Sequence, residues 1–375
     1  MPIVMILVLL RCFVKSNFLQ CSMTNNQEMK ILVVRFKFIG DVLLSSTLCA
    51  SLRASFPDAQ IDYLMHANAA ALFEGNPDID NILTLSPADR KSLAYFRKIW
   101  HITRANYDII IDATSTAKTE MISLLSPRSS YKIGRYKKGR GLFYTHKIAK
   151  QFNNKIDQRM AMLKPLMDDG FQIVEDRQLK AFLSESENAA MQNRISVAGI
   201  DQKKKLFAFS VSSKFEHRYW NLDYMEEVVQ HCLAQHNAQI LLLPGMAHEQ
   251  QLVDRFHQRF DGNANVYSTV EADSLRELCA LLKQCDIFVG NEGGPRHFAQ
   301  AVGLPTVCVF SPSAKLNEWL PELSSRHQAV EWRTVFSGTV EPEYTNGDAT
   351  YGELYDLIRP SHLIALVDDA VAKHL

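Results

Sequence analysis

The chain lacks the features that mark several large classes of protein. Its seven cysteines form no Cys-x-x-Cys pair and mostly lie in apolar segments, which is typical of reduced, buried thiols in a cytosolic protein and argues against a zinc site or a disulfide framework. Its 41 basic residues balance 41 acidic ones, so any charged ligand must be recognised by a local patch. No internal repeat or low-complexity tract occurs either.

The first 28 residues lack the marks of a membrane span and of a signal peptide. The apolar run 2–10 is about half the length that a span requires, and it lacks the preceding basic residues and the clear small-residue cleavage site of a signal peptide. We expect residues 1–28 to be a dispensable or wrongly translated leader. A short membrane-surface anchor, helped by Arg11 and Lys15, is the alternative.

Short apolar runs alternate with helical patterns from Met29 onward, and they predict two doubly wound α/β domains. A chain of 375 residues is long enough for each domain to bury its own core. The polar stretch Ser184–Lys205 separates the two series of runs, so we expect it to connect the domains. The runs lie at 31–34, 61–64, 109–111, 206–211, 240–243, 287–289 and 306–310.

A glycine-rich turn follows the predicted strand at 287–289. Gly293 and Gly294 would let backbone amides approach a ligand where the next helix begins, and such a helix start attracts anions. An ordinary strand-to-helix turn is an equally good interpretation of these residues alone.

A second informative segment follows the strand at 31–34. Arg35 and Lys37 lie in the loop after it, and Asp41 falls at the start of the next helix. Taken by itself, Asp41 is as well explained by a helix cap, which contributes about 1 kcal/mol, as by a general base.

Together these segments resemble the ADP-heptose:lipopolysaccharide heptosyltransferases of glycosyltransferase family 9. Ile39-Gly-Asp-Val-Leu43 is similar to the family's (I/L)GD(V/M)L, and Gly290-Asn-Glu-Gly-Gly-Pro-Arg-His297 is similar to its (G)(N/V)DSGPMH. Glu292 and Gly293 depart from the Asp and Ser of that motif. The resemblance continues through Phe56–Asp62, Asn76–Asp80, Arg218–Trp220 and Pro244–Glu249, so it covers nearly everything from Met29 to the C-terminus.

The resemblance implies an α/β fold of the GT-B type, with two Rossmann-like doubly wound domains facing an interdomain cleft. The acceptor domain would span 29–190 and the nucleotide-sugar domain 200–358, and a helix over 359–375 would cross back to the first domain. The implied reaction is inverting transfer of heptose from ADP-heptose to the lipopolysaccharide inner core, without metal or cofactor. The alternatives are a GT-B transferase that uses another nucleotide sugar, and a catalytically silent sugar-nucleotide or glycan-binding homologue.

The resemblance also implies roles for individual residues. The expected catalytic residues are Asp41, which matches the proposed base, and Arg218, which stands where the family has a Lys that contacts the phosphates. Glu249 matches a Glu on the nucleotide ribose, whereas a histidine such as His297 more often packs inside its helix and is expected to bind at most. The expected donor-binding residues are Ser212, Ser213, Lys214, Glu249, Glu292, Gly293, Gly294 and His297.

The segment 128–147 carries seven Lys or Arg residues and no acidic one. Such a run is usually just a solvated face of the protein. Because this one follows a first-domain strand, we expect it to hold an anionic lipopolysaccharide core. The same charges would favour peripheral contact with the cytoplasmic face of the inner membrane. No nucleic-acid-binding module accompanies them. The expected acceptor-binding residues are Arg35, Lys37, Lys137, Lys138 and Arg140.

Two motifs are discounted. Asp78-Ile-Asp80 matches a metal-binding Asp-x-Asp, but it follows Asn76-Pro77 in a predicted turn. Gly139-Arg-Gly141 follows no predicted strand and lacks the third glycine of a dinucleotide fingerprint. The sequence therefore predicts no catalytic metal site and argues against an NAD-dependent dehydrogenase.

Overall fold

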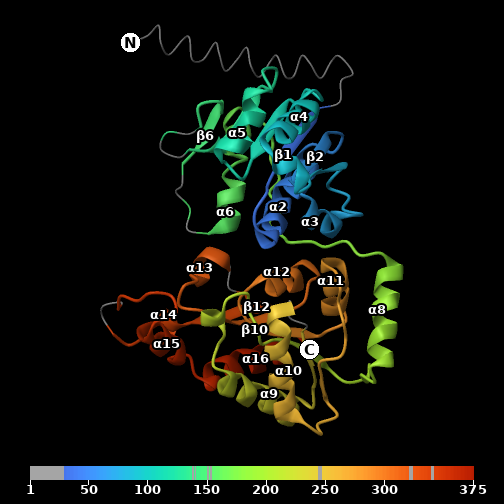
Figure 1. Cartoon of the computed structure of the whole chain (residues 1–375), viewed down its shortest axis with the longest axis vertical. Coiled ribbons are helices and arrows are strands. Elements are labelled where there is room, and N and C mark those ends of the chain that lie inside the picture. The colour runs from blue at the N-terminus through green and yellow to red at the C-terminus, as the bar shows by residue number, and fades with distance from the viewer. Residues whose placement is uncertain are drawn as a thin grey trace. The chain divides into compact units, whose positions relative to one another are not determined.

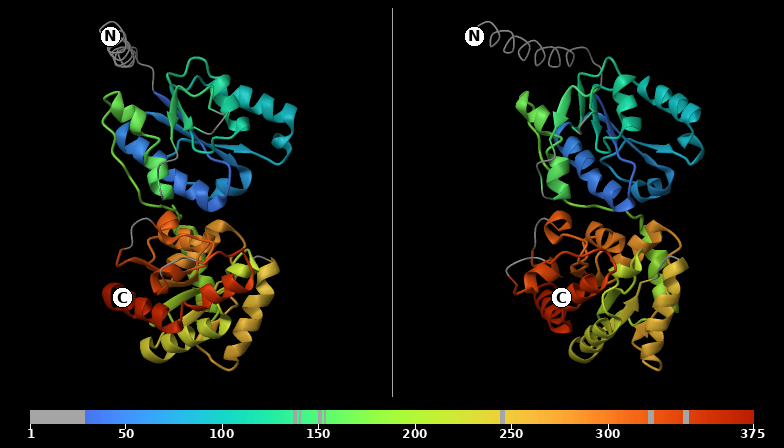
Figure 2. Two further views of the ribbon diagram at one scale, coloured as in Figure 1. Left: turned by 90° about the vertical axis from the view of Figure 1, so that its left-hand side faces the viewer. Right: turned by 60° about the vertical axis from the view of Figure 1, so that its left-hand side comes forward.

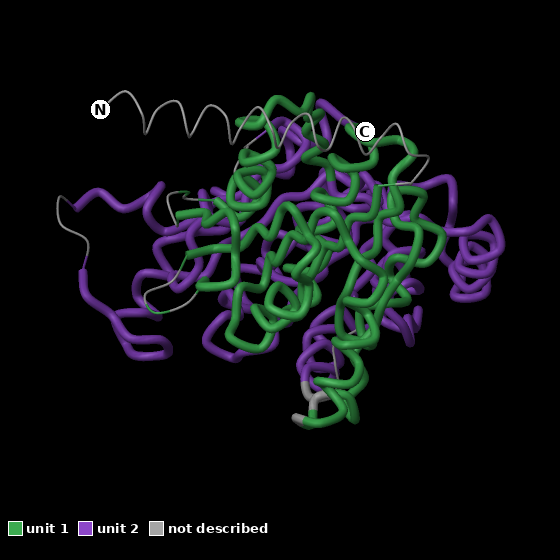
Figure 3. Tube along the Cα trace, turned by 90° about the horizontal axis from the view of Figure 1, so that it is seen from above, with its two compact units in different colours: residues 1–178 green, residues 179–375 purple. Residues whose placement is uncertain are grey.

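The computed structural model describes residues 29–375 except 137–138, 140, 150–151, 153, 244–246, 321–323 and 339–341. The chain divides into two compact units, of which the first ends at Gln178 and the second begins at Leu179 (Figures 1 and 3). In each unit, helices cover both faces of a parallel sheet (Figure 2).

Unit 1 contains a six-stranded sheet in the order β3-β2-β1-β4-β5-β6. Its central strands are continuous apolar runs, as expected for strands covered on both faces. The strands are β1 (Lys30–Val34), β2 (Gln60–His66), β3 (Asn81–Leu85), β4 (Ile109–Asp112), β5 (Tyr131–Arg135) and β6 (His146–Ile148). The helices are α2 (Ile39–Ser55), α3 (Ala67–Ala70), α4 (Ser92–Thr103), α5 (Ala117–Leu124), α6 (Lys155–Met160) and α7 (Lys164–Asp168), with the 3-10 helices η2 (Ala71–Phe73) and η3 (Ala88–Arg90).

Unit 2 repeats the arrangement in the order β12-β11-β10-β7-β8-β9. The strands are β7 (Leu206–Ser210), β8 (Gln239–Leu242), β9 (Val266–Tyr267), β10 (Ile287–Asn291), β11 (Thr306–Phe310) and β12 (His327–Glu331). The helices are α8 (Glu185–Val197), α9 (Leu222–His236), α10 (Ala247–His257), α11 (Leu275–Lys283), α12 (Gly294–Ala301), α13 (Leu316–Trp319), α14 (Trp332–Val335), α15 (Ala349–Asp356) and α16 (Pro360–His374), with η4 (Glu216–Arg218) and η5 (Gln258–Phe260).

Both sheets have the strand order of a Rossmann fold, so the predicted fold class, α/β with two Rossmann-like doubly wound domains, is confirmed. The direction of the connections reverses between β1 and β4 in unit 1, and between β7 and β10 in unit 2. Ligands of such sheets bind at the carboxyl ends of the strands at this reversal. The loops after Val34, Asp112, Ser210 and Asn291 are therefore the places to look for a site.

The polar stretch that we expected to connect the domains belongs to unit 2. Ser184 caps α8, and the Glu187 carboxylate accepts a hydrogen bond from the Ser184 amide in return. Arg276 of α11 pairs with Glu187, and Arg194 pairs with Glu277. The Ser-Glu-Ser-Glu run is thus a helix start rather than a linker, and the boundary between the units lies earlier.

The last helix also belongs to unit 2. Leu363, Val367 and Val371 of α16 are part of the core that includes β7, β10 and β11, and α16 packs against α9, β11 and β12. The apolar face of α16 is thus occupied by its own unit's sheet, while the crossing of this helix to the first domain stays a prediction.

Gly290 allows β7 and β10 to approach closely at the reversal. Its φ is +137°, and a Cβ at this position would lie 2.3 Å from the Ser210 carbonyl oxygen. A side chain here would therefore have to push the two strands apart at the point where their loops diverge.

Gly290→Ala is expected to destabilise unit 2 by about 2–4 kcal/mol, because the strained φ and the backbone contact add. Urea denaturation followed by tryptophan fluorescence would measure it, since three of the four tryptophans (Trp220, Trp319 and Trp332) lie in unit 2. Gly352→Ala is the matched control: Gly352 is exposed in α15 with open space around it, so alanine should stabilise by about 0.5–1 kcal/mol. Equal effects of the two changes would contradict the close-approach argument.

Candidate active site

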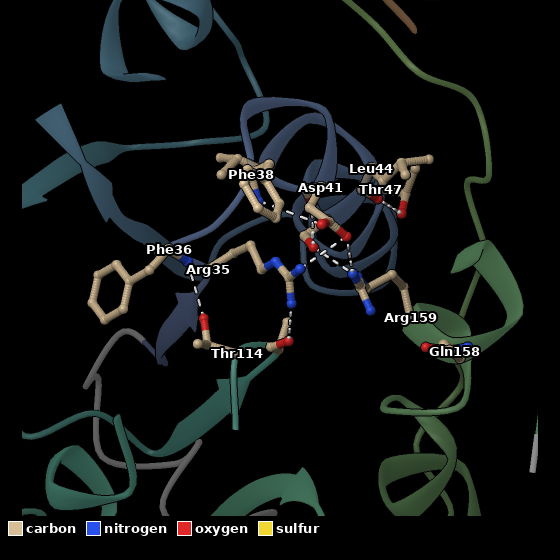
Figure 4. Close-up of polar contacts among 12 residues, drawn as sticks. Arg35, Phe36, Phe38, Asp41, Leu44, Thr47, Thr114, Gln158 and Arg159 are labelled. Atoms are coloured by element: carbon tan, nitrogen blue, oxygen red, sulfur yellow. Dashed lines mark hydrogen bonds and ion pairs between the residues drawn. The ribbon is translucent and has the colours of Figure 1, made fainter. Parts of the chain in front are cut away.

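Asp41 lies in the first turn of α2, directly after the loop that follows β1. Its Oδ1 atom is 2.8 Å from Arg35 Nη2 and 3.1 Å from Arg159 Nη2 (Figure 4). Asp41 Oδ2 accepts a 3.4 Å hydrogen bond from the Phe38 amide at the start of the helix. Asp41 therefore helps to cap α2 while two guanidinium groups fix its carboxylate.

Arg35 ties this carboxylate to the end of β4. It donates a 2.7 Å hydrogen bond from Nη1 to the Ala113 carbonyl, and the neighbouring Phe36 amide donates to Thr114 Oγ1 at 3.0 Å. The loops after β1 and β4 are thus joined at the reversal of unit 1. Arg35 and Asp41 therefore lie together, whereas Lys37 is exposed.

Asp112 orders the loop that Arg35 contacts. Its Oδ1 accepts from the Thr114 and Ser115 amides at 3.0 and 2.8 Å, and its Oδ2 accepts from the Tyr144 hydroxyl at 2.6 Å. Burial raises the pKa of Asp112, although these hydrogen bonds oppose the shift. A buried acid with all these partners serves as a support for the loop.

Arg159 is the site residue that the sequence did not reveal. It lies on α6, 118 residues from Asp41, is almost fully buried, and also donates from Nε to Ser45 Oγ at 2.7 Å. Burial and the nearby Arg35 lower its pKa to about 9, while Asp41 opposes that shift. The available signal was an arginine among the apolar residues Met160, Met162 and Leu163, but nothing in the spacing links it to Asp41.

Three arginines gather near the carboxylates of Asp41 and Asp112, because Arg135 ends β5 at the same end of the sheet. Arg135 donates from Nη2 to the Thr114 carbonyl at 3.4 Å, and burial together with Arg35 lowers its pKa. Within the described residues, Arg35 Nε, Arg135 Nε and Arg159 Nη1 are buried and donate to no atom. Positive charge is thus in excess here, and the site suits an anionic group.

The other predicted acceptor-binding residues lie outside the described part of the chain. These are Lys137, Lys138 and Arg140. Their neighbours Leu142 and Phe143 are exposed, and the Phe143 amide donates to Glu120 Oε1 at 3.0 Å.

Asn291 organises the reversal point of unit 2. Its side-chain nitrogen donates to the Val211 carbonyl at 2.9 Å, and its Oδ1 accepts from the Trp220 amide at 3.0 Å. One buried side chain therefore positions both the loop after β7 and the segment that carries Arg218. The sequence analysis assigned no role to Asn291, although it lies inside the glycine-rich motif.

The predicted donor-binding residues gather in pairs around this point. Arg218 Nη1 is 3.5 Å from Glu292 Oε1, and the Ser311 hydroxyl donates to the same oxygen at 3.2 Å. On the other side, Ser212 donates to Glu249 Oε2 at 3.2 Å. Ser213 is half-buried and Lys214 is exposed, with its Nζ 5.5 Å from the centre of the Phe215 ring.

The start of α12 is open to a ligand. Gly293 caps the helix without a side-chain hydrogen bond, and the first turn has no acidic residue. A Cβ on Gly293 or Gly294 would meet no atom closer than 3.8 Å. The first amides of α12 and the Arg218 guanidinium thus supply positive potential around this turn.

His297 is placed for packing. It is 5% exposed, its ring lies 5.9 Å from that of Trp319, and Arg296 Nη2 is 3.3 Å from its Nε2. Burial and the adjacent Arg296 hold the pKa of His297 well below its usual value. A neutral, buried imidazole of this kind supports the start of α12 by packing.

A cavity of about 510 Å³ opens beside Arg218, between η4 and α15. Glu216, Asp348 and Asp356 contribute to its lining. Three carboxylates disfavour a diphosphate, so the turn before α12 remains the better place for an anionic ligand.

Comparison with known proteins identifies the family of the chain. The model of glycosyltransferase family 9 (heptosyltransferase) matches residues 96–330, which is more than half of the chain. The chain belongs to glycosyltransferase family 9. The resemblance inferred from the two motifs is thus confirmed, and this family 9 chain is a glycosyltransferase.

Several relatives match this family 9 chain over most of its length. Lipopolysaccharide heptosyltransferase 3 of Escherichia coli is 22% identical over 341 residues, which cover 88% of the chain and 96% of the relative. The structure of E. coli ADP-heptose lps heptosyltransferase II has a TM-score of 0.71 at 17% identity, covering 92% of this chain and 99% of that one. E. coli heptosyltransferase WaaC with ADP-2-deoxy-2-fluoro heptose has a TM-score of 0.63 at 17% identity, covering 91% and 99%. These structures share the fold.

Arg218→Ala is expected to raise the Kd for ADP by about 10–100-fold, as is typical for loss of a hydrogen bond to a charged group. Isothermal titration calorimetry would measure it. Arg259→Ala is the control, because Arg259 is similarly exposed in unit 2 but pairs with Asp223 and Glu226 of α9. An unchanged affinity in the Arg218 variant would show that the guanidinium does not contact the phosphates.

Proposed function

We propose that the chain is an inverting glycosyltransferase that moves heptose from ADP-heptose to the lipopolysaccharide inner core. The observation that carries the proposal is Asp41, held by Arg35 and Arg159 at the strand reversal of unit 1. The names of the E. coli relatives, and the ADP-heptose analogue bound by one of them, supply the sugar, the donor and the acceptor class.

Asp41 would act as the general base. Its Oδ1 is taken by two guanidinium groups, so Oδ2 is the oxygen that we assign to the acceptor hydroxyl. As Oδ2 takes the proton, the hydroxyl oxygen attacks the anomeric carbon of the heptose. The bond from that carbon to ADP breaks, and its electron pair leaves with the diphosphate. Attack from the face opposite the diphosphate inverts the anomeric configuration.

The donor would bind at the reversal of unit 2. We assign the diphosphate to Arg218, to the first amides of α12 at Gly293 and Gly294, and to the loop of Ser212, Ser213 and Lys214. A cation and helix-start amides can neutralise the leaving diphosphate, so we propose a reaction without metal. Glu249 would accept from the ribose hydroxyls and Glu292 from the sugar hydroxyls, while His297 supports the turn from below.

The acceptor would be held by its negative charges. The excess of positive charge from Arg35, Arg135 and Arg159 around Asp41 favours a carboxylate or a phosphate next to the reacting hydroxyl. Lys37, Lys137, Lys138 and Arg140 would extend this field over the rest of an anionic core.

Another nucleotide sugar is the second candidate donor. Glu292 and Gly293 stand where the family motif has Asp and Ser, next to the proposed sugar position. A silent binding protein fits less well, because such a protein has no need for a carboxylate fixed by two buried guanidinium groups.

The proposed location is the cytoplasm, with peripheral contact to the inner membrane. Helix α4 exposes Leu93, Phe96 and Trp100, which are 65%, 42% and 46% accessible and follow one another at helical spacing. The helix has no acidic residue, and Arg104 lies over the Trp100 ring at 5.8 Å. An exposed aromatic stripe with cations is typical of a helix that rests on an anionic lipid surface. No described helix is both long and apolar enough to span a bilayer.

A transfer assay tests the function. Purified chain is incubated with ADP-heptose and a truncated, heptose-acceptor core, and the product is detected by mass spectrometry. ADP-glucose and UDP-glucose serve as competing donors. Transfer from one of these but not from ADP-heptose would overturn the proposed donor.

Asp41→Asn should lower kcat by about 10²–10⁴-fold and leave the Kd for ADP nearly unchanged, because the amide cannot take the proton. Asp223→Asn is the control, since Asp223 is also a first-turn helix aspartate but lies in α9, where it pairs with Arg259. Near wild-type turnover of the Asp41 variant would remove this residue from the mechanism.

The double change Phe96→Ser and Trp100→Ser should weaken binding to vesicles of anionic lipid at least about tenfold, because two aromatic side chains no longer enter the interface. Vesicle co-sedimentation would measure it. Val197→Ser removes a side chain that is 80% exposed on α8 and should have no effect. A similar loss in both proteins would mean that α4 is not the contact.

A further inference from the structure

Two histidines and an aspartate meet in unit 2 at a place that the reaction does not use. His231 and His236 lie on α9, and Asp368 lies on α16. The two Nε2 atoms are 2.8 and 2.7 Å from Asp368 Oδ1. One ligand atom from each residue can be chosen so that all lie within 4.8 Å of one another.

The cluster lies at the amino ends of the strands, and the donor site lies at their carboxyl ends. Strand β7 runs toward the loop of Ser212, α9 returns in the reverse direction, and β8 begins at Gln239 just after α9 ends. His236, the last residue of α9, is therefore at the amino ends of the strands, whereas Arg218 and Gly293 are at their carboxyl ends. Figure 1 shows α9 and α16 on the side of unit 2 away from α12 and α13.

We propose that His231, His236 and Asp368 form a binding site for a divalent transition-metal ion of the zinc class. Imidazole nitrogen with carboxylate oxygen is a donor set that Zn²⁺ accepts in its tetrahedral sites, and water completes the coordination where the protein gives three ligands. The cysteine spacing that argued against a zinc site does not bear on this cluster, which contains no cysteine. The side chains are 23%, 15% and 45% exposed, so an ion can reach the site from solvent.

The surroundings keep the carboxylate available for a cation. Among the described residues, the ion pairs of Asp368 are those with the two histidines, and no Lys or Arg competes for it. The two imidazoles are thus the groups that would share the carboxylate with an incoming ion.

A bound ion would join the last helix to the body of unit 2. Helix α16 covers the sheet through Leu363 and Val367, and the ion would add a link from its polar side to the end of α9. The role is structural and independent of the proposed transfer, for which we propose no metal. Without an ion, the same residues form a hydrogen-bonded clasp, which is the alternative to be distinguished.

Calorimetric titration of tag-free, EDTA-stripped full-length chain with Zn²⁺ tests the site. We expect one Zn²⁺ per chain, and a Tm higher by roughly 5–10 °C when Zn²⁺ is a hundredfold above its Kd. Co²⁺ in its place should give the absorption of a site with nitrogen and oxygen ligands.

His231→Gln and Asp368→Asn should each abolish the stoichiometric binding and the shift in Tm. Both replacements can keep a hydrogen bond across the cluster, and their Tm in EDTA checks that they fold. His257→Gln is the control, because His257 lies on α10 and contacts the Val266 carbonyl. Absence of stoichiometric Zn²⁺ binding in the wild-type chain, or equal binding in folded Asp368→Asn, would overturn the proposal and leave the clasp. Transfer activity should be equal with and without EDTA, so this result is separate from that of the transfer assay.

Discussion

The reversal of the connections at the first strand of each sheet is the constraint on which the rest of the structure depends. Parallel strands covered on both faces offer a ligand their carboxyl ends, and only where neighbouring connections diverge is there room for it. In unit 1 the diverging loops are joined by Arg35 and Thr114, and in unit 2 by Asn291. Asp41 and Arg218 have their positions because these loops are held.

Burial of charge governs the chemistry of unit 1. Two carboxyl groups, Asp41 and Asp112, and three arginines lie in a site that is largely closed to water, where removing a charge from solvent is costly unless a partner compensates it. Asp41 compensates Arg35 and Arg159 in part, so positive potential remains at the start of α2, where the helix dipole adds to it. An anionic ligand would neutralise this remaining positive potential. In the free protein the uncompensated charge lowers the stability of the folded state.

The sequence predicted the central strands well and the outer strands poorly. The seven apolar runs became β1, β2, β4, β7, β8, β10 and β11. Central strands must be apolar on both faces, whereas β5 and β6 lie inside the basic segment, and β3, β9 and β12 are short or partly polar. The same contrast holds for the site: Asp41, Arg218 and the glycine turn follow strands that the pattern reveals. Arg159 reaches Asp41 only through the packing of α6 on α2, and no local spacing carries such long-range contacts.

The place of α16 has a consequence for the order in which the protein forms during synthesis. Unit 1 is complete in sequence by Gln178, so it can fold while the rest of the chain is still being made. The core of unit 2 includes Leu363, Val367 and Val371, so it stays open until almost the last residue has left the ribosome. The half of the protein proposed to hold the acceptor would thus be in place before the half proposed to hold the donor. During this interval the apolar face of the second sheet lacks the cover that α16 gives it, and it needs protection from aggregation.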